Sequence, residues 1–328
     1  MMMSKLILRA FFLTPLVCGI FAFDGAQIAR AQNMIYQDIE RLPVPPADHR
    51  IAYGDDPLQF GELRLPEGEG PHPVAIIIHG GCWYSAYDIK HIGNFAAALT
   101  ATGVATWTLE YRRIGNPGGG WPGTFEDVAQ GTDRLRVLAR SYPLDLRRVV
   151  AVGHSAGGQL ALWLAARRHL PRSSLLRSFK PLSLRGVISL AGITDMRRFS
   201  PRCNNAVGRL LGGSPEEVAF RYQQTSPVEM LPLRIPQRLI HGAQDRIVPL
   251  ESSREYEAKA RQSGDDTRLT ILDNAGHFEL IAPQSPAWPT VENALRELLT
   301  LRIQRTAYGK SLLFKACQGS GINSINNQ

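Results

Sequence analysis

The chain has 328 residues, of which 44% are hydrophobic and 20% are charged, and its formal net charge is +8. This composition is typical of a globular protein with a large core, and a single domain can hold most of a chain of this length. The basic excess comes without a nucleic-acid-binding motif, so it predicts a solvated basic surface and no nucleic-acid partner.

The N-terminus is expected to be an export signal. Lys5 and Arg9 flank the start of a mostly apolar run over residues 10–23, and Ala29 and Ala31 frame a small-x-small cleavage pattern. The run is short for a membrane span, which needs about 20 apolar residues. We therefore expect cleavage after Ala31, a periplasmic or secreted protein and no stable membrane insertion. A retained membrane anchor is the alternative.

Beyond the signal, the pattern of apolar residues predicts an α/β fold. Residues 51–53 and 58–65 are typical of an edge hairpin, and residues 74–78 are typical of a central strand buried on both faces. Strand and helix patterns then alternate, which predicts a mostly parallel, doubly wound sheet of about eight strands with its site at the strands' carboxyl ends. The later strands are expected at 104–109, 149–152, 186–190, 237–241 and 268–272, and helices at 89–102, 124–141, 285–301 and from the end of the 149–152 strand to about residue 169.

Two segments interrupt this alternation. Residues 192–236 are too long for a simple connection and are expected to form a small helical cap after the sixth strand, with 214–217 as a helix start. A glycine-rich loop over 114–121 ends in Trp121 and is either a mobile pocket wall or an ordinary loop. The expected organisation is a signal peptide at 1–31, an extended lead-in at 32–48, the main domain at 49–306 and a flexible tail at 307–328.

Two glycine-containing motifs follow strands of the predicted sheet. His-Gly-Gly-Cys-Trp occupies 79–83, directly after the 74–78 strand, and Gly-His-Ser-Ala-Gly occupies 153–157, directly after the 149–152 strand. The second motif places Ser155 on a tight turn from strand to helix, where a side chain at either glycine would collide with the backbone. The helix N-terminus then lies behind the serine hydroxyl, which suits a nucleophile that develops negative charge.

An acid and a histidine follow later strands. Asp245 lies in His-Gly-x-x-Asp-x-x-Val-Pro, and His277 lies in Ala-Gly-His-Phe after the last strand; of the 8 histidines, His277 alone has this placement. The order Ser155, Asp245, His277 is that of one lineage of Ser-His-Asp triads. Asp195, which follows the preceding strand, is the alternative candidate for the acid of the triad. It is expected instead to cap the following segment or to line the pocket.

These motifs carry a family resemblance over roughly residues 50–303. The chain resembles the His-Gly-Gly esterase and lipase branch of the α/β-hydrolases, close to kynurenine formamidase-like (arylformamidase) hydrolases and small bacterial carboxylesterases. The resemblance implies an oxyanion hole formed by the backbone N–H groups of Gly81 or Cys82 and of Ala156. Trp83, His154 and Trp121 are expected to line the substrate pocket. 

Three further residues, Tyr111, Arg112 and Asp127, also look like that branch. The family usually has an aromatic residue where this chain has Cys82, and this departure puts an aryl-formamide substrate in doubt.

Three cysteines would remain after cleavage, namely Cys82, Cys203 and Cys317. An odd number in an oxidising compartment leaves at least one free thiol or an intermolecular bridge. Cys82 is expected to be free because it lies in the loop at 79–83 that would supply N–H groups to the oxyanion hole, hereafter the oxyanion loop. A Cys203–Cys317 bridge stays open.

The resemblance implies a serine hydrolase that cleaves a small or aryl carboxylic ester through an acyl-enzyme, and the N-terminal signal predicts that it is exported. The sequence has no metal-ligand spacing and no phosphate-binding loop, so no metal and no organic cofactor are expected. Arylformamide or amide hydrolysis is the alternative, followed by a prolyl-oligopeptidase-like peptidase. A catalytically inactive hydrolase fold that acts as a binding protein is the non-enzyme alternative. The natural substrate and the oligomeric state do not follow from the sequence.

Overall fold

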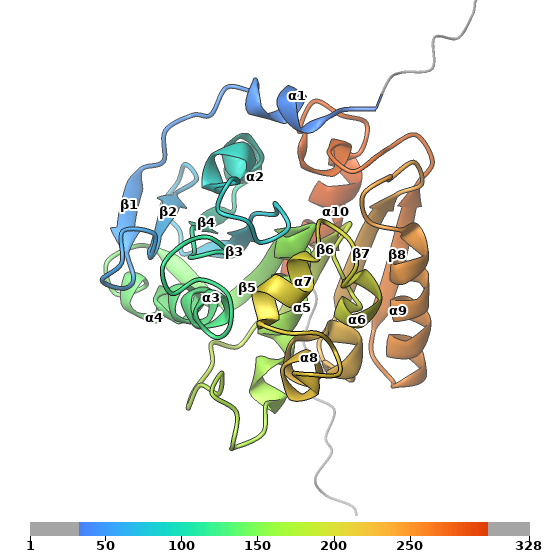
Figure 1. The fold of residues 1–328 in the computed structure, drawn as a ribbon. Helices are drawn as coiled ribbons and strands as arrows, with labels where there is room; N and C mark the ends of the chain where they lie inside the picture. The colour runs from blue at the N-terminus through green and yellow to red at the C-terminus, as the bar shows by residue number, and fades with distance from the viewer. Residues whose placement is uncertain (1–32, 301–328) are drawn as a thin grey trace, which may run out of the picture. The chain divides into compact units, whose positions relative to one another are not determined.

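An eight-stranded sheet forms the centre of the computed structural model, which describes residues 33–300 (Figure 1). The strand order is β1-β2-β4-β3-β5-β6-β7-β8. β2 pairs antiparallel with β1 and β4, and the other neighbouring strands are parallel, so the predicted mostly parallel sheet is confirmed. The strands are β1 (His49–Ala52), β2 (Phe60–Arg64), β3 (His72–Ile78), β4 (Ala105–Leu109), β5 (Leu144–His154), β6 (Gly186–Leu190), β7 (Gln237–Gly242) and β8 (Thr267–Leu272).

Helices cover both faces of this sheet because its central strands are apolar on both faces. In β3, Val74, Ile76 and Ile78 belong to one buried cluster, while Ala75 and Ile77 belong to another. The first cluster is shared with α3 (Gly123–Asp133), α4 (Leu135–Leu138), α5 (Ala156–Ala166) and α9 (Leu250–Gln262). The second is shared with η1 (Ile89–Ile92), α2 (Gly93–Ala101), η4 (Glu279–Ile281) and α10 (Trp288–Thr300). This layering is the predicted doubly wound arrangement.

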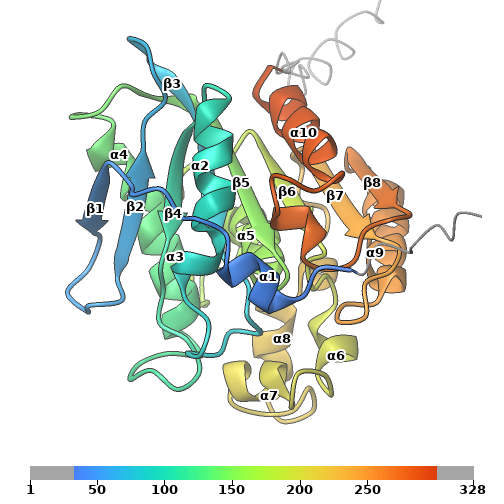
Figure 2. The same cartoon turned by 90° about the horizontal axis from the view of Figure 1, so that it is seen from above.

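The segment between β6 and β7 forms the expected helical cap. It contains α6 (Met196–Phe199), α7 (Ala206–Leu211), α8 (Ala219–Thr225) and η3 (Pro227–Glu229), and the three α-helices lie together at one end of α5 (Figure 2). α8 begins later than the predicted start at 214–217, because Ser214 and Glu217 close a separate turn in which the Ser214 N–H donates to Glu217 Oε2 at 2.8 Å. The cap is fastened to α5, since Trp163 Nε1 donates to the Gln224 carbonyl at 3.0 Å.

The lead-in over 33–48 differs from the extended segment that we expected, because it contains α1 (Tyr36–Glu40). Asp38 Oδ2 accepts a hydrogen bond from the Ile35 N–H at 2.9 Å and so closes the first turn. Ile39 is buried against the sheet's second cluster. The Met34 N–H also donates to Glu279 Oε1 at 2.6 Å, which attaches the lead-in to the segment after β8.

The helix after the glycine-rich loop also begins differently from the prediction. α3 starts at Gly123, and Thr124 lies inside it instead of capping it. The Thr124 hydroxyl donates to the Arg112 carbonyl at 2.6 Å and accepts from the Gly120 N–H at 3.0 Å. Thr124 therefore holds the glycine-rich loop against the start of α3.

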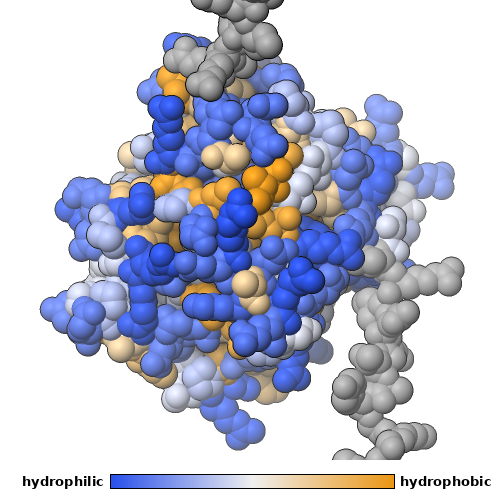
Figure 3. Space-filling model, turned by 90° about the vertical axis from the view of Figure 1, so that its right-hand side faces the viewer, coloured by the Kyte–Doolittle hydropathy of each residue, from blue (hydrophilic) through white to orange (hydrophobic). Residues whose placement is uncertain are grey.

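Several predictions fall outside residues 33–300: the signal peptide at 1–31, the tail at 307–328 and Cys317. Within 33–300, no helix is both long enough and apolar enough to cross a membrane. The face seen from the β8 side carries mainly hydrophilic side chains, with hydrophobic residues between them (Figure 3). α9 fits this pattern, since only Ser253, Tyr256 and Ala260 of its residues are buried.

Candidate active site

Ser155 lies between the end of β5 and the start of α5. Its backbone has a φ of 56°, in the left-handed region that non-glycine residues rarely occupy. A Cβ at Gly153 would overlap the Gly157 carbonyl oxygen, and a Cβ at Gly157 would overlap the Ile78 carbonyl oxygen. Both glycines are therefore needed for this tight turn, as the sequence predicts for a nucleophile elbow.

The loop after β3 lies directly against this turn. A Cβ at Gly80 would lie 2.8 Å from the His154 carbonyl oxygen and 3.0 Å from Ser155 Cβ, so only glycine permits the approach. None of the hydrogen bonds described for residues 33–300 uses the backbone N–H of Gly81, Cys82 or Ala156. The N–H groups that the resemblance assigns to an oxyanion hole are therefore available beside Ser155.

Asp245 and His277 meet at the carboxyl end of the sheet. The Nδ1 atom of His277 lies 2.7 Å from Asp245 Oδ2. The other carboxylate oxygen accepts from the backbone N–H groups of Ile247 at 2.8 Å and Val248 at 2.9 Å. Because Asp245 occupies Nδ1, Nε2 is the ring nitrogen of His277 that can serve Ser155.

The environment keeps Asp245 charged. Burial alone would raise the pKa of Asp245, but hydrogen bonds from His241 and His277 and the His277 charge hold it well below its usual value. His241 Nε2 lies 3.4 Å from Asp245 Oδ2 and 3.0 Å from the Val248 carbonyl oxygen. A fixed carboxylate of this kind can orient a neighbouring imidazole and stabilise its protonated form.

Asp195, the alternative candidate for the acid, takes the structural role that we expected. It is the N-cap of α6, and its Oδ1 accepts a hydrogen bond from the Arg198 N–H at 3.1 Å. His277 contacts Asp245 and not this residue.

Trp83 and His154, the first two residues predicted to line the pocket, are buried, as Ser155 and His277 are. The Trp83 indole N–H donates to Gln159 Oε1 at 3.2 Å, so this ring supports the oxyanion loop from α5. His154 Nε2 donates to the His277 carbonyl at 2.9 Å. Burial, together with the His277 charge, lowers the pKa of His154 well below its ordinary value, so this ring is neutral. Its hydrogen bond holds the loop that carries His277 in place.

Cys82 is not free, which corrects our expectation. It forms a disulfide with Cys203, at a sequence separation of 121. The Cys203–Cys317 pairing that the sequence left open is therefore excluded. Cys203 lies in the cap between α6 and α7, and this position only becomes close to Cys82 when the cap folds back over the sheet.

A buried ionic cluster below the oxyanion loop was not predicted as a unit. Glu110 Oε1 lies 3.1 Å from His79 Nε2 and 2.5 Å from Arg113 Nη1, and its Oε2 accepts from the Ile89 N–H at 3.1 Å. Burial would raise the pKa of Glu110, but His79 and Arg113 hold it below its ordinary value. The cluster joins the two ends of the loop at 79–89 to the end of β4. The Glu-Tyr-Arg-Arg run after that strand was the available sequence signal.

A second ion pair, between a partly buried arginine and a buried aspartate, fixes the glycine-rich loop. The guanidinium of Arg112 donates from Nε and Nη2 to Asp127, at 2.8 and 2.6 Å. Gln59 Nε2 donates to the same carboxylate at 2.7 Å. Two residues of the family resemblance therefore act as a bidentate support for the loop that leads to Trp121.

The N-terminal helix brings an aromatic residue across the site. Tyr36 lies edge-on to Tyr87, with ring centroids 5.1 Å apart, and 6.0 Å from the Phe278 ring. Tyr87 lies over Gly81 in the oxyanion loop, and Phe278 follows His277. Ser155 is only 2% exposed and His277 6%. Tyr36 thus bridges two loops around an almost closed serine, a role that the expected extended lead-in did not predict.

Trp121, the third residue predicted to line the pocket, borders a hollow together with α8, and Ser155 is not among the residues that line this hollow. Within residues 33–300, no group of three or more His, Cys, Asp and Glu side chains is placed to hold a metal ion.

A family model described as BD-FAE matches residues 62–260, which is more than half of the chain. Among curated proteins, the chain is similar to Esterase LipC of Mycobacterium tuberculosis, at 26% identity over 71% of this chain and 60% of the relative. It is also similar to an isoprenylcysteine alpha-carbonyl methylesterase of Arabidopsis thaliana, at 24% identity over 70% of this chain and 56% of the relative. The chain thus spans less than two thirds of the length of these relatives.

Among solved structures, a truncated form of a carbohydrate esterase from gut microbiota has a TM-score of 0.68 at 20% identity. The match covers 79% of this chain and 98% of that one. Together with the strand order, this likeness shows that the chain has the α/β-hydrolase fold that the sequence predicts.

Proposed function

Since this chain belongs to the BD-FAE family, we propose that it is an exported serine esterase that cleaves a small or aryl carboxylic ester. The observation that carries the proposal is the 2.7 Å contact between His277 Nδ1 and Asp245 Oδ2, at the same end of the sheet as the strained Ser155 turn. The relatives named as esterases support the ester-cleaving activity.

In the proposed mechanism, Ser155 attacks the ester carbonyl carbon while His277 Nε2 takes the proton of its hydroxyl. Asp245 holds the imidazole by Nδ1 and stabilises its positive charge. The N–H groups of Ala156 and of Gly81 or Cys82 stabilise the tetrahedral oxyanion, at about 3 to 4 kcal/mol per donor. His277 then returns the proton to the departing alcohol. In the second step, His277 takes a proton from the water that attacks the acyl-enzyme carbonyl and returns it to the oxygen of Ser155, which is released together with the acid product. No cofactor is required.

Export is part of the proposal. The charged and apolar start of the chain and the small residues Ala29 and Ala31 support a cleaved signal. The Cys82–Cys203 disulfide supports an oxidising compartment, because such bonds persist in the periplasm or outside the cell. N-terminal sequencing of protein recovered from the periplasm or medium should give a chain that begins at Gln32, and recovery of the uncleaved chain in the membrane fraction would contradict it.

The activity is tested by initial rates on 4-nitrophenyl esters of increasing acyl length and on N-formyl-arylamines. We expect rapid turnover of short esters and slow turnover of formamides. Ser155→Ala should lower ester turnover by more than about 10⁴-fold. Ser183→Ala, which changes an exposed serine, is the matched control and should keep the native rate.

The alternative functions predict different results in the same experiment. Faster cleavage of the formamides than of the esters would favour the arylformamidase alternative. Full activity in Ser155→Ala would remove Ser155 as the nucleophile. An absence of turnover together with an absence of labelling by a fluorophosphonate would favour a catalytically inactive binding protein.

A further inference from the structure

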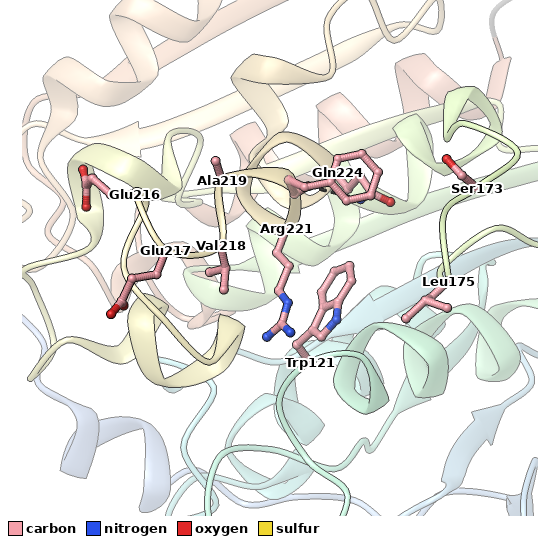
Figure 4. Close-up of a pocket in the computed structure, with 10 residues that line it drawn as sticks. Trp121, Ser173, Leu175, Glu216, Glu217, Val218, Ala219, Arg221 and Gln224 are labelled. Atoms are coloured by element: carbon pink, nitrogen blue, oxygen red, sulfur yellow. Dashed lines mark hydrogen bonds between the residues drawn. The ribbon is translucent and has the colours of Figure 1, made fainter.

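A hollow of about 520 Å³ lies apart from the catalytic residues. Trp121 forms one wall, α8 with the turn before it forms a second, and a loop carrying Ser173 and Leu175 forms a third (Figure 4). Ser155, Asp245 and His277 are not among the lining residues. Ester cleavage as proposed above does not account for this hollow.

The hollow is nevertheless attached to the helix that begins at Ser155. The Trp121 and Phe125 rings are 6.0 Å apart, and the Phe125 and Trp163 rings are 5.1 Å apart. Trp163 lies eight residues after Ser155, or about 12 Å along the axis of α5. The hollow is therefore packed, through two buried rings, against the helix that follows Ser155.

Apolar surface is exposed around the hollow. Leu175 is 72% exposed and Phe220 is 52% exposed, although both are large apolar residues. Trp121 is half-buried, and the guanidinium of Arg221 lies 5.6 Å from the centroid of its ring. Figure 4 shows Trp121 and Arg221 side by side, with Leu175 on the opposite side of the indole. An exposed aromatic face beside a concave surface is typical of a ligand site.

One polar atom at the same place lacks a partner among the described residues. Gln224 is only 3% exposed, and its Nε2 donates to the Phe220 carbonyl at 3.1 Å. Its Oε1 is buried without a hydrogen-bond partner among residues 33–300, an arrangement that costs about 1 to 3 kcal/mol. Because Gln224 lines the hollow, a ligand hydroxyl that donates to this oxygen would remove the cost.

The charges around the hollow restrict the ligand. Glu216 and Glu217 are exposed on one side, and Arg221 lies between them and the indole. The two carboxylates disfavour an anionic ligand, and the guanidinium disfavours a cationic one. The hydroxyl groups of a neutral ligand can donate hydrogen bonds to the carboxylates and accept them from the guanidinium. The C–H face of a sugar ring also packs on an indole.

We propose that this hollow is a second binding site, for a neutral sugar ring of an oligosaccharide or polysaccharide. The sugar ring packs on Trp121 between Leu175 and Phe220, and its hydroxyl groups bond to Gln224 Oε1, Arg221 and the two carboxylates. The site binds sugar without reaction and would hold a polysaccharide chain beside the esterase site. It does not depend on esterase activity.

Binding of xylohexaose, cellohexaose and mannohexaose to the purified protein tests the proposal by isothermal titration calorimetry. These sugars carry no ester, so the result is independent of turnover, and Ser155→Ala should bind as the native protein does. At least one hexasaccharide should bind, and Trp121→Ala should weaken it about tenfold or more. Phe220→Ala should also weaken binding, and because Phe220 is exposed this variant should keep the native melting temperature.

Phe179→Ala is the matched control, because Phe179 is a fully exposed phenylalanine that does not line the hollow. It should bind each hexasaccharide with native affinity. The proposal is overturned if none of the three sugars binds at millimolar concentration, or if Trp121→Ala and Phe220→Ala bind as tightly as Phe179→Ala. Loss of esterase activity in Ser155→Ala with unchanged sugar binding would support both proposals separately.

Discussion

Cys82 and Cys203 are joined by a disulfide across 121 positions of the chain, and the bond ties the loop after β3 to the cap. The hydroxyl of Tyr84 adds a second connection, because it donates to the carbonyls of Cys203 and Asn204, each at 3.1 Å. Cys82 has a φ of 49°, which is uncommon for a residue with a side chain. The backbone N–H proposed for the oxyanion hole is thus held by a covalent tie to a segment outside the sheet.

Reduction of this disulfide is expected to slow the enzyme. Without the tie, the loop can leave the conformation that directs its N–H groups toward the oxyanion, so kcat on 4-nitrophenyl acetate should fall about tenfold or more with a smaller change in KM. Loss of the bond should also destabilise the fold by about 2 to 4 kcal/mol. Rates and urea unfolding curves with and without dithiothreitol measure both effects.

Cys203→Ser provides the control for this experiment. It should have the low kcat of the reduced enzyme, and dithiothreitol should not lower it further. Equal kcat and equal stability in the oxidised native protein and in Cys203→Ser would show that hydrogen bonds alone hold the loop.

Replacement of Asp245, the proposed triad acid, should harm catalysis far more than replacement of Asp195, the alternative acid. Asp245→Asn removes the charge that stabilises the His277 imidazolium and disturbs the ring's tautomer, so kcat/KM should fall by about 10³- to 10⁴-fold. Asp195→Asn removes only an N-cap charge, so it should lose less than about 2 kcal/mol of stability and little activity. Steady-state kinetics and thermal melting of both variants test this order.

Asp273→Asn is the matched control for the acid, since Asp273 is exposed on the loop that leads to His277. Its kinetics should equal those of the native protein. A larger loss of kcat in Asp195→Asn than in Asp245→Asn would mean that Asp195 is the acid that serves His277 during catalysis.

Local sequence signals are sufficient to predict most of the sheet and the proximity of Asp245 and His277. The apolar runs at 74–78 and 149–152 lie within β3 and β5 of the structure, because residues buried on both faces leave an unbroken apolar pattern. The glycines around Ser155 likewise mark a turn that only glycine permits. Asp245 and His277, predicted from short motifs after two strands, lie together because parallel strands end at the same edge.

Contacts between distant segments could not be predicted in the same way. Cys82 and Cys203 meet only through the path of the cap, and no spacing rule relates them. Trp83 was predicted to line the pocket, and the direction of its side chain depends on α5, where Gln159 accepts its N–H. Trp121 was also predicted to line the pocket, and its ring lies beside Arg221 of α8, a neighbour that no local motif indicates. α1 forms because Tyr36 packs on loops that come later in the chain.

Glu110 is expected to position the oxyanion loop, although it lies beneath the loop and is not proposed to contact substrate. Glu110→Gln leaves Arg113 as a buried charge without its carboxylate and weakens the bonds to His79 and the Ile89 N–H. We expect a loss of about 3 kcal/mol in unfolding free energy and a lower kcat with little change in KM. Urea unfolding and steady-state kinetics measure the two effects.

Glu67→Gln, in an exposed turn, is the matched control for Glu110→Gln and should change neither quantity. A variant of Glu110 that loses stability but keeps the native kcat would show that the cluster supports the fold without positioning the loop.

Asp145 should make the stability of the protein depend on pH in acid. Burial would raise its pKa, but hydrogen bonds from Arg148 and Arg147 lower it to about 2, below the value of about 3.9 for an unfolded chain. A lowered folded pKa means that the stabilisation is fully present above pH 5 and is lost as the pH falls toward 2. Because both arginines are partly or largely exposed, the contribution at pH 7 should be about 1 kcal/mol.

Asp145→Asn should therefore unfold more easily than the native protein at pH 7, and the difference should shrink steadily between pH 5 and pH 2. Urea unfolding at pH 7, 5, 4 and 3 measures this difference, with Asp55→Asn, at an exposed turn, as the matched control. The change should concern stability alone, because Asp145 lies at the start of β5, at the opposite end of that strand from Ser155. A difference between Asp145→Asn and the native protein that stays constant from pH 7 to pH 3 would contradict the prediction, because neutral hydrogen bonding would then account for the whole effect.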